Sequence, residues 1–153
     1  MSNWKGELPC FAVSELSCHH CGQLKLDLVF AMALVSLRYA WGSPLYLNSV
    51  CRCSEHNDDV DGHPNSLHQT ENPVHATDGT AAVDVNWGTW PKEVKFKFAQ
   101  LAWSLGWSLG LAQTFMHLDA RAFLPTLTLD QKIFHYDNWT YIFSDVDIKG
   151  DSK

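Results

Sequence analysis

The spacing of apolar residues predicts a first helix over residues 26–41. Apolar side chains recur there at helical intervals, and Gly42 directly after the segment is typical of a helix end. Because the segment is apolar nearly all round, we expect a central helix. Its core-facing stripe should consist of four residues, Leu28, Met32, Val35 and Tyr39.

A second helix is predicted over residues 91–105. Pro91 suits the first turn, because a helix start leaves its N–H groups unpaired and proline has none, and Gly106 suits the end. Five residues form the expected buried stripe of this helix, Val94, Phe98, Leu101, Ala102 and Leu105.

Short apolar runs bounded by turn-forming residues predict strands. They lie at residues 45–48, 81–85, 115–119, 126–129 and 133–143, the last being broken near Asp137. This order of elements predicts an α+β fold, with helices packed on a small, mainly antiparallel sheet. A length of 153 residues suits a single domain spanning residues 1–153.

The polar stretch at residues 51–85 gives the first indication of chemistry. It holds four of the eight histidines, and a long irregular segment in a small domain usually has a function. Its last residues form an apolar run that contains Asp84. A carboxylate in such a run costs several kcal/mol unless a cation compensates it. A metal ion shared with nearby histidines would be such a cation.

The run at residues 115–119 supplies a second part of the same site. Alternation along a strand places Phe115, His117 and Asp119 on one face. One histidine of the polar stretch, Asp84 and His117 would give three nitrogen and oxygen ligands with a free fourth position. That coordination is typical of catalytic rather than structural zinc.

Composition and charge exclude several classes of protein. Hydrophobic residues at 46% and charged residues at 18% indicate a globular chain, and a net charge of -6 argues against nucleic-acid binding. No apolar run approaches the length of a membrane span, and the N-terminus lacks the features of a signal peptide. We therefore expect a monomer made in the cytoplasm, with no membrane partner.

The five cysteines allow a second metal site. An odd number fits reduced thiols or metal ligands better than a disulfide framework. The candidate ligands are Cys18, Cys21, Cys51 and Cys53, with His19 and His20 between the first two. The alternative interpretation is a group of buried thiols without a metal.

Five short motifs together resemble a known family of zinc peptidases. They are FAVSELSC at residues 11–18, NSVCRCSEHN at 48–57, NSLH at 65–68, AVD at 82–84 and FMHLD at 115–119. In this order they resemble the D-alanyl-D-alanine carboxypeptidases and L-alanyl-D-glutamate endopeptidases, including phage endolysins, which share a fold with the Hedgehog signalling domain. The resemblance covers about residues 10–121. It implies a zinc ion and a peptidoglycan peptide as substrate.

The resemblance also implies roles for individual residues. His68, Asp84 and His117 correspond to the zinc ligands, Arg52 to the arginine that supports the substrate carbonyl or oxyanion, and Ser66 to the substrate-binding position beside the first ligand. The stretch between His68 and Asp84 is longer than in the family, so His75 is an alternative first ligand.

The general base is less clear from the sequence. Many relatives have an acidic residue three positions before the last histidine, where this chain has Thr114. Asp119 is the candidate base because it shares a strand face with His117. Its alternative role is to orient a zinc ligand by a hydrogen bond.

The expected function is a zinc-dependent peptidase that cuts the peptidoglycan stem or cross-link. As a phage-type lysis enzyme it would act at the cell wall after release, or within a phage particle. A non-catalytic, zinc-stabilised binding module of the same fold is the alternative. A third interpretation is a regulator built on a Cys/His zinc site, in which His68 has no role.

Overall fold

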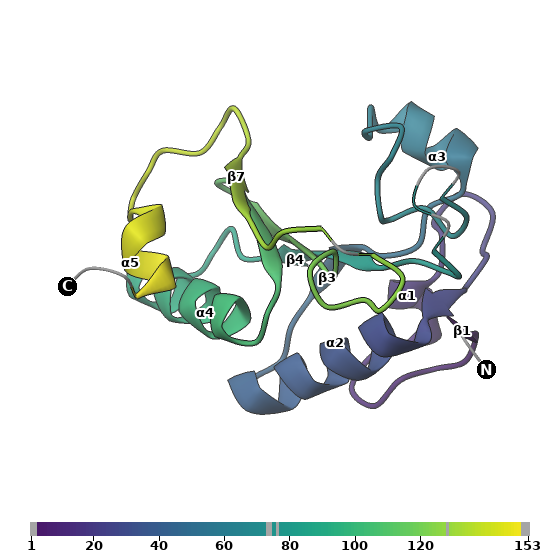
Figure 1. Cartoon of the computed structure of the whole chain (residues 1–153), viewed down its shortest axis with the longest axis horizontal. Helices are drawn as coiled ribbons and strands as arrows, with labels where there is room; N and C mark the ends of the chain where they lie inside the picture. Colours follow the sequence, from purple (N-terminus) through teal and green to yellow (C-terminus); the bar gives the residue numbers. More distant parts are fainter. Residues whose placement is uncertain (1–2, 73–74, 76, 128, 151–153) are drawn as a thin grey trace.

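A five-stranded sheet forms the centre of the molecule in the computed structural model, which describes residues 3–72, 75, 77–127 and 129–150 (Figure 1). Its strands are β3 (Leu47–Ser49), β4 (Ala82–Asn86), β5 (Ser108–Leu111), β6 (Phe115–Asp119) and β7 (Ile133–His135). They lie in the order β3-β4-β6-β5-β7. The β5–β7 pair is parallel and the other three pairs are antiparallel. The predicted α+β fold with a mainly antiparallel sheet is confirmed.

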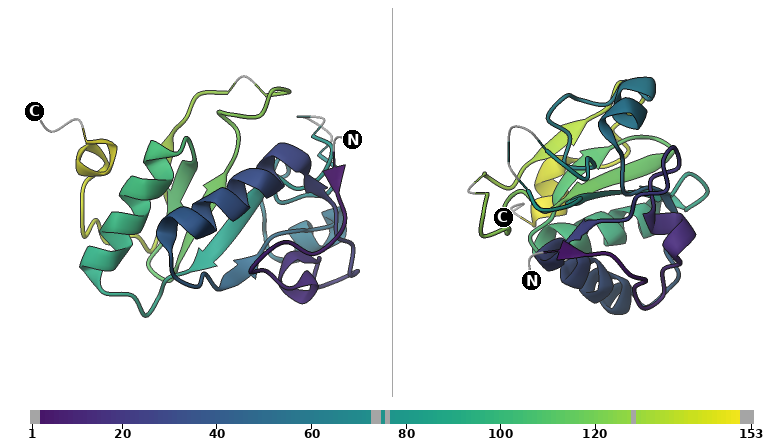
Figure 2. Two further views of the ribbon diagram at one scale, coloured as in Figure 1. Left: turned by 90° about the horizontal axis from the view of Figure 1, so that it is seen from below. Right: turned by 90° about the vertical axis from the view of Figure 1, so that its right-hand side faces the viewer.

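Helices cover one face of this sheet. The helices are α1 (Val13–Leu16), α2 (Leu28–Trp41), α3 (Ser54–Asp59), α4 (Lys92–Ser104) and α5 (Asp145–Lys149), and a small pair, β1 (Asn3–Trp4) and β2 (Leu26–Asp27), precedes α2. α2 and α4 lie on the same side of the sheet, whereas α3 and its flanking loops rise on the other side (Figures 1 and 2). None of the described helices is long and apolar enough to cross a bilayer.

Helix α2 confirms the first predicted helix. The Asp27 side chain accepts a hydrogen bond from the Phe30 N–H at its start, and Gly42 ends it in a left-handed conformation with φ of 79°. The predicted stripe was wrong, because Met32 and Tyr39 are 64% and 62% exposed. The face against the core consists of Phe30, Ala31, Leu34 and Leu37. In a helix that is apolar all round, periodicity does not select the buried face.

Helix α4 confirms the second predicted helix, which begins just after Pro91. Phe98 and Ala102 of the predicted stripe are buried, but Leu105 is 45% exposed. Lys95 is buried instead, and its Nζ donates a hydrogen bond to the Gln113 carbonyl oxygen at 3.0 Å. This bond links the helix to the β5–β6 turn and satisfies the buried ammonium group.

The strands that carry polar site residues were predicted to within one residue, and the tail was not. Residues 133–143 form a strand only as far as His135, because the chain turns at Asp137 and Tyr141 adopts a positive φ of 55°. The described part of residues 126–129 contains no strand, and residue 128 lies outside the described residues. β5, α3 and α5 had no predicted counterpart.

Candidate metal centre

Two neighbouring strands bring Asp84 and His117 together. β4 and β6 run antiparallel, and their register pairs these two residues directly. Because side chains alternate along a strand, both lie on the face opposite the core, while their neighbours Val83 and Leu118 are fully buried. The sheet therefore fixes a carboxylate beside an imidazole.

His68 reaches the same point from the polar stretch. Its backbone carbonyl accepts hydrogen bonds from the Arg52 N–H at 2.9 Å and from Thr80 Oγ1 at 2.8 Å, and Thr70 N–H donates to the Arg52 carbonyl at 2.9 Å. The side-chain Nδ1 donates to the Val50 carbonyl oxygen at 2.9 Å. This bond places the proton on Nδ1 and leaves the Nε2 lone pair free for a metal.

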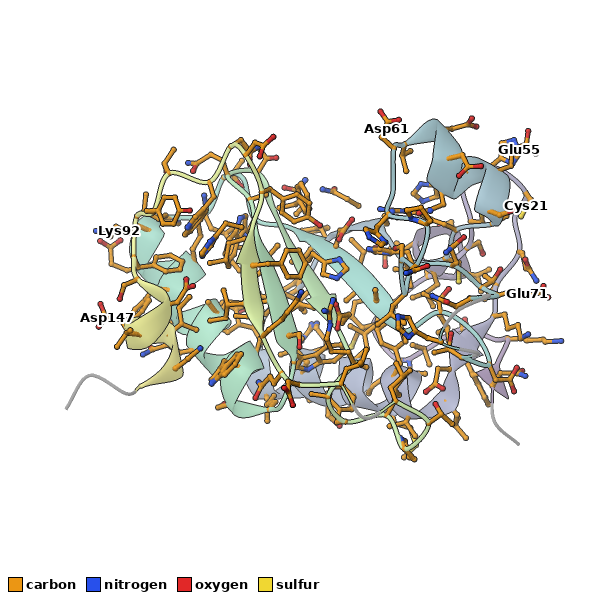
Figure 3. All side chains as sticks on the ribbon, turned by 45° about the horizontal axis from the view of Figure 1, so that its top comes forward. Cys21, Glu55, Asp61, Glu71, Lys92 and Asp147 are labelled. Carbon is orange, nitrogen blue, oxygen red and sulfur yellow. The ribbon has the colours of Figure 1, made fainter. Side chains whose placement is uncertain are left out.

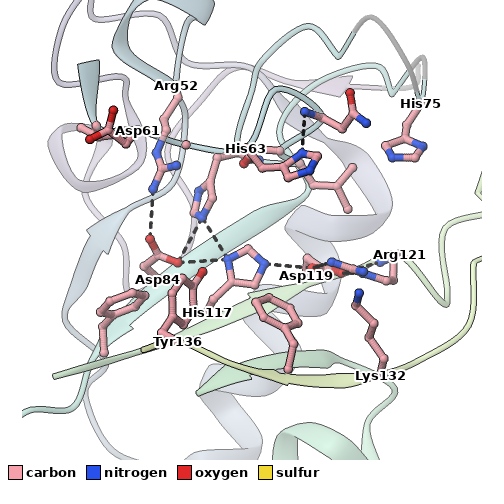
Figure 4. Close-up of a pocket in the computed structure, with 18 of the residues that line it drawn as sticks. Arg52, Asp61, His63, His75, Asp84, His117, Asp119, Arg121, Lys132 and Tyr136 are labelled. Carbon is pink, nitrogen blue, oxygen red and sulfur yellow. Dashed lines mark hydrogen bonds and ion pairs between the residues drawn. The ribbon is translucent and has the colours of Figure 1, made fainter. Parts of the chain in front are cut away.

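The three candidate ligand atoms converge closely. His68 Nε2 and His117 Nδ1 each lie 3.1 Å from Asp84 Oδ1, and the two nitrogens are 3.2 Å apart (Figure 4). A zinc ion with nitrogen ligands at 2.0–2.1 Å in tetrahedral geometry separates them by about 3.3 Å. The residues His68, Asp84 and His117 can therefore bind a metal ion, and their nitrogen and oxygen donors suit zinc.

Burial and charge together set the protonation of this group. Burial lowers the pKa of both imidazoles, but hydrogen bonds to Asp119 and Asp84 raise the pKa of His117 to about 9, whereas the pKa of His68 stays below its usual value. Burial would raise the pKa of the Asp84 carboxyl, and the neighbouring His68 and His117 hold it well below the usual range. Without metal, His117 thus carries a proton between two carboxylates. A cation held by His68, Asp84 and His117 would take the place of that proton on Nδ1.

A second carboxylate lies behind His117. Asp119 Oδ2 is 2.8 Å from His117 Nε2 and 2.6 Å from Arg121 Nη2. Its Oδ1 accepts hydrogen bonds from the Arg121 backbone N–H at 3.1 Å and from Nε at 2.8 Å. Asp119 is completely buried, and these bonds hold its carboxyl pKa well below the usual range despite that burial. The carboxylate is thus placed to fix the orientation and tautomer of His117.

Arg52 holds the other carboxylate oxygen of the centre. Its Nη2 donates to Asp84 Oδ2 at 3.1 Å, its Nε to Ser49 Oγ at 3.0 Å and its Nη1 to Asn57 Oδ1 at 3.3 Å. The Asn57 amide comes from α3 and packs against Gly62, where any Cβ would collide with it. The guanidinium is therefore fixed from three sides beside the candidate ligands.

The centre lies at the floor of a cleft of about 720 Å³. Side chains from the polar stretch form one wall and side chains from β6, β7 and their extensions form the other (Figure 4). Besides His117 and Asp119, the residues labelled on the second wall are Arg121, Lys132 and Tyr136. Burial and the charge of Asp84 raise the pKa of the Tyr136 hydroxyl to about 12, so it stays protonated at neutral pH.

The structure brings most of the predicted site residues into this cleft. His68, Asp84, His117, Arg52, Ser66 and Asp119 all line it. Ser66 Oγ accepts the His68 backbone N–H at 3.2 Å. His75 also lines the cleft, but it lies apart from the group of candidate ligands formed by His68, Asp84 and His117 (Figure 4). Thr114 is exposed in the β5–β6 turn and does not line the cleft.

Two groups of cleft residues were missed by sequence reasoning. Arg121 continues the alternation of His117 and Asp119 beyond the end of β6, so extending that pattern would have found it. Lys132 and Tyr136 lie on the opposite side of the β7 segment from His135, whose Nε2 bonds Asp145 outside the cleft. Alternation with a period of two along this segment would have placed Lys132 and Tyr136 on one face of the strand and His135 on the other.

Comparison with known families gives one match. The family described as Peptidase M15 matches residues 9–119, which is most of the chain and includes His68, Asp84 and His117. Comparisons with curated protein sequences and with solved structures gave no significant match. With the matched segment containing the whole candidate metal centre, the chain belongs to the peptidase M15 family, whose members are zinc-dependent.

Proposed function

We propose that the protein hydrolyses a peptide bond in the peptidoglycan stem or cross-link, as a phage-type lysis enzyme. The convergence of His68, Asp84 and His117 at the floor of an open cleft beside Arg52 carries this proposal. Three protein ligands leave a fourth position for water or substrate, as in catalytic rather than structural sites. The peptidoglycan substrate and the phage setting rest on the resemblance of the sequence motifs.

The residues of the cleft have different roles in the proposed hydrolysis. His68, Asp84 and His117 would hold the zinc ion, which would supply Lewis acidity to polarise the scissile carbonyl and to acidify water at neutral pH. Arg52 is paired with Asp84 through Nη2 beside the ligand atoms, and we assign to its guanidinium the stabilisation of the negative charge that develops on the carbonyl oxygen. One such preorganised donor typically contributes a few kcal/mol to the transition state.

Tyr136 provides a second donor from the opposite wall. Its side chain points toward Asp84 and His117 (Figure 4), and its raised pKa keeps the hydroxyl protonated. The hydroxyl can therefore donate a hydrogen bond to the oxyanion or a proton to the leaving amine. Tyr136 thus complements Arg52 across the cleft.

The same wall offers a position for a substrate carboxylate. The Lys132 ammonium lies 5.4 Å from the centre of the Phe134 ring, and Arg121 lies 5.7 Å from it on its side. Arg121 is paired with Asp119, whereas Lys132 has no ion pair among the described residues, so we assign the anion to Lys132. Stem peptides of peptidoglycan carry free carboxylates, which suit this cation.

For Asp119 we propose positioning rather than proton transfer. Each of its oxygens already accepts two hydrogen bonds, and the carboxylate is completely buried. A general base must reach the attacking water, whereas this carboxylate is separated from the ligand face by the His117 ring. It instead keeps His117 Nε2 protonated and Nδ1 free for the metal.

The alternative function is a zinc-stabilised binding module without catalysis. One observation favours it, because the position that is acidic in many relatives is Thr114, which is exposed outside the cleft. In that case the cleft would bind a peptidoglycan peptide and leave it intact.

The test is hydrolysis of purified peptidoglycan by the zinc-loaded chain. We expect new free amino groups and soluble peptides, their loss on chelation, and their loss in His117→Ala. His135→Ala is the matched control, because that histidine lies outside the cleft and should leave activity intact. Zinc bound stoichiometrically with no released peptide would contradict the enzyme and favour the binding module.

A further inference from the structure

A second cluster of metal-ligating side chains lies apart from the cleft. The sulfur atoms of Cys18, Cys21 and Cys53 all lie within 4.8 Å of one another, and none of these residues lines the cleft. Cys18 and Cys21 belong to the turn after α1, whereas Cys53 immediately precedes α3. Cys21 is labelled in Figure 3, on the side of the molecule where α3 carries Glu55. All three cysteines are free thiols. Segments 32 residues apart in the sequence, from Cys21 to Cys53, thus meet through sulfur atoms.

A histidine lies beside this cluster and contacts one of its sulfur atoms. His20 Nδ1 lies 3.5 Å from Cys53 Sγ, and its Nε2 lies 3.7 Å from Glu55 Oε1. The carboxylate favours the proton on Nε2, which leaves the Nδ1 lone pair toward the thiols. A carboxylate behind the far nitrogen of a histidine is the usual companion of a metal-bound imidazole.

The distances fit the edges of a zinc tetrahedron. With Zn–S of about 2.3 Å and Zn–N of 2.0–2.1 Å, a sulfur and a nitrogen ligand lie about 3.5 Å apart and two sulfurs about 3.8 Å apart. The Cys53–His20 separation equals that edge, and the sulfur–sulfur separations of at most 4.8 Å exceed the second edge by no more than about 1 Å. Such a set has no open position, as in structural zinc sites.

The backbone already supports thiolates at these positions. The Cys53 N–H donates to Cys18 Sγ at 3.4 Å, and the His56 N–H donates to Cys53 Sγ at 3.4 Å. The turn that presents Cys18 is closed by a 2.8 Å bond from the Gly22 N–H to the Cys18 carbonyl oxygen, and Gly22 has the φ of 77° that favours glycine. N–H donors directed at sulfur stabilise its anionic, metal-binding form.

We propose that Cys18, Cys21, Cys53 and His20 bind a structural zinc ion, separate from the cleft. Cys51, which the sequence placed in the same candidate set, is not part of it, because its buried thiol lies 3.7 Å from the Lys25 carbonyl oxygen. The ion would tie the N-terminal segment to the loop that carries Arg52, directly before Cys53 in the chain.

The test is metal content and cobalt spectroscopy of the full chain purified under reducing conditions. We expect two zinc ions per chain, a loss of one in Cys21→Ser, a loss of one in His117→Ala, and a loss of both in the double variant. Cys10→Ser is the matched control, because this exposed thiol lies outside the cluster and should leave both ions in place.

Cobalt distinguishes the two sites directly. A Co²⁺ ion bound by thiolates gives a sulfur-to-metal charge-transfer band in the near ultraviolet, which a site of imidazoles and a carboxylate lacks. We expect the band in the wild-type chain and in His117→Ala, its loss in Cys21→Ser, and an altered tetrahedral spectrum in His20→Ala.

Three results would overturn the proposal. The first is equal zinc content in Cys21→Ser and Cys10→Ser. The second is the absence of a charge-transfer band in the wild-type chain loaded with Co²⁺. The third is a disulfide among the three cysteines that persists under the reducing conditions of the purification. Unchanged zinc content in His117→Ala would instead refute the proposed function and leave the cysteine site standing. The two proposals therefore fail separately.

Discussion

The substitution Asp119→Asn separates the two roles that this carboxylate could have. In the wild-type chain its oxygens accept four hydrogen bonds, three from Arg121 and one from His117 Nε2. An asparagine offers one oxygen and one NH₂ group. If the NH₂ group turns toward His117, the imidazole must move its proton to Nδ1, which then cannot bind metal. If the NH₂ group turns away from His117, it faces the N–H groups of Arg121, which are also donors, so no hydrogen bond forms there.

The magnitude follows from this conflict of donors. Loss of a hydrogen bond behind a metal-bound histidine typically costs a factor of 10–100 in metal affinity. The substitution also removes the negative charge from the ion pair with Arg121. Because Asp119 is fully buried and the Arg121 side chain is 20% exposed, we expect the free energy of unfolding to fall by about 2–4 kcal/mol. If Asp119 were the general base, its removal would instead lower kcat by a factor of about 10²–10⁴.

The assay measures zinc affinity and turnover separately. Competition with a chelator gives the Kd for zinc, and release of amino groups from peptidoglycan at saturating zinc gives kcat. For a positioning role we expect weaker zinc binding and a kcat close to wild type once zinc is restored. Asp145→Asn is the control, because it removes a comparable contact to His135 outside the cleft and should change neither quantity.

The opposite pattern of zinc affinity and kcat would exclude a positioning role for Asp119. Unchanged zinc affinity with a kcat reduced 100-fold or more at saturating zinc would make Asp119 the base. Thermal unfolding of each variant without zinc shows whether a general loss of structure accounts for the result.

Three further predictions concern the cleft. Arg52→Gln should lower kcat about 10²–10³-fold while zinc remains bound, because the fixed charge at the oxyanion is lost. The pKa of His117 is raised from 6.5 to about 9 in the metal-free chain, so its protonation stabilises the fold below pH 6.5 and this contribution fades toward pH 9. Because zinc needs the same nitrogen unprotonated, the rise in Tm on adding zinc should grow from pH 6.5 to 9. Gly110→Ala should cost about 1–3 kcal/mol, since a Cβ there would lie 2.6 Å from the Phe134 ring and 3.0 Å from His117 Cβ.

Each of these has a result that would contradict it. Full activity in Arg52→Gln would remove the guanidinium from the mechanism. A zinc-induced rise in Tm that is constant between pH 6.5 and 9 would exclude competition with a proton on His117. An unchanged Tm in Gly110→Ala would show that β7 moves aside without cost.

Local patterns in the sequence predicted two of the three residues of the candidate metal centre, Asp84 and His117. Period-two alternation put His117 and Asp119 on one face of β6, and the apolar neighbours of Asp84 marked it as a buried carboxylate. His68 came from its motif, and the bond from its Nδ1 to Val50 joins segments that no local pattern connects. The final position of such a loop residue depends on long-range contacts.

The remaining errors also have physical causes. The buried face of α2 was wrong because Met32 and Phe30 are equally apolar, and only the packed sheet distinguishes between them. Tyr136 was missed because it reaches the cleft through β7, which pairs in parallel with a strand from another part of the chain. Parallel pairing leaves no signature in a short segment of sequence.

The part of the second cleft wall that comes from the β7 segment lies outside the region matched by the family. Residues 9–119 carry the family signature, yet Lys132, Phe134 and Tyr136 come after that segment and close the cleft on one side. A change in these three residues would therefore alter one wall of the cleft and leave His68, Asp84 and His117 of the matched segment as they are. On the proposed function, a chimera with another tail should change which peptide is cut and still bind the metal ion at His68, Asp84 and His117.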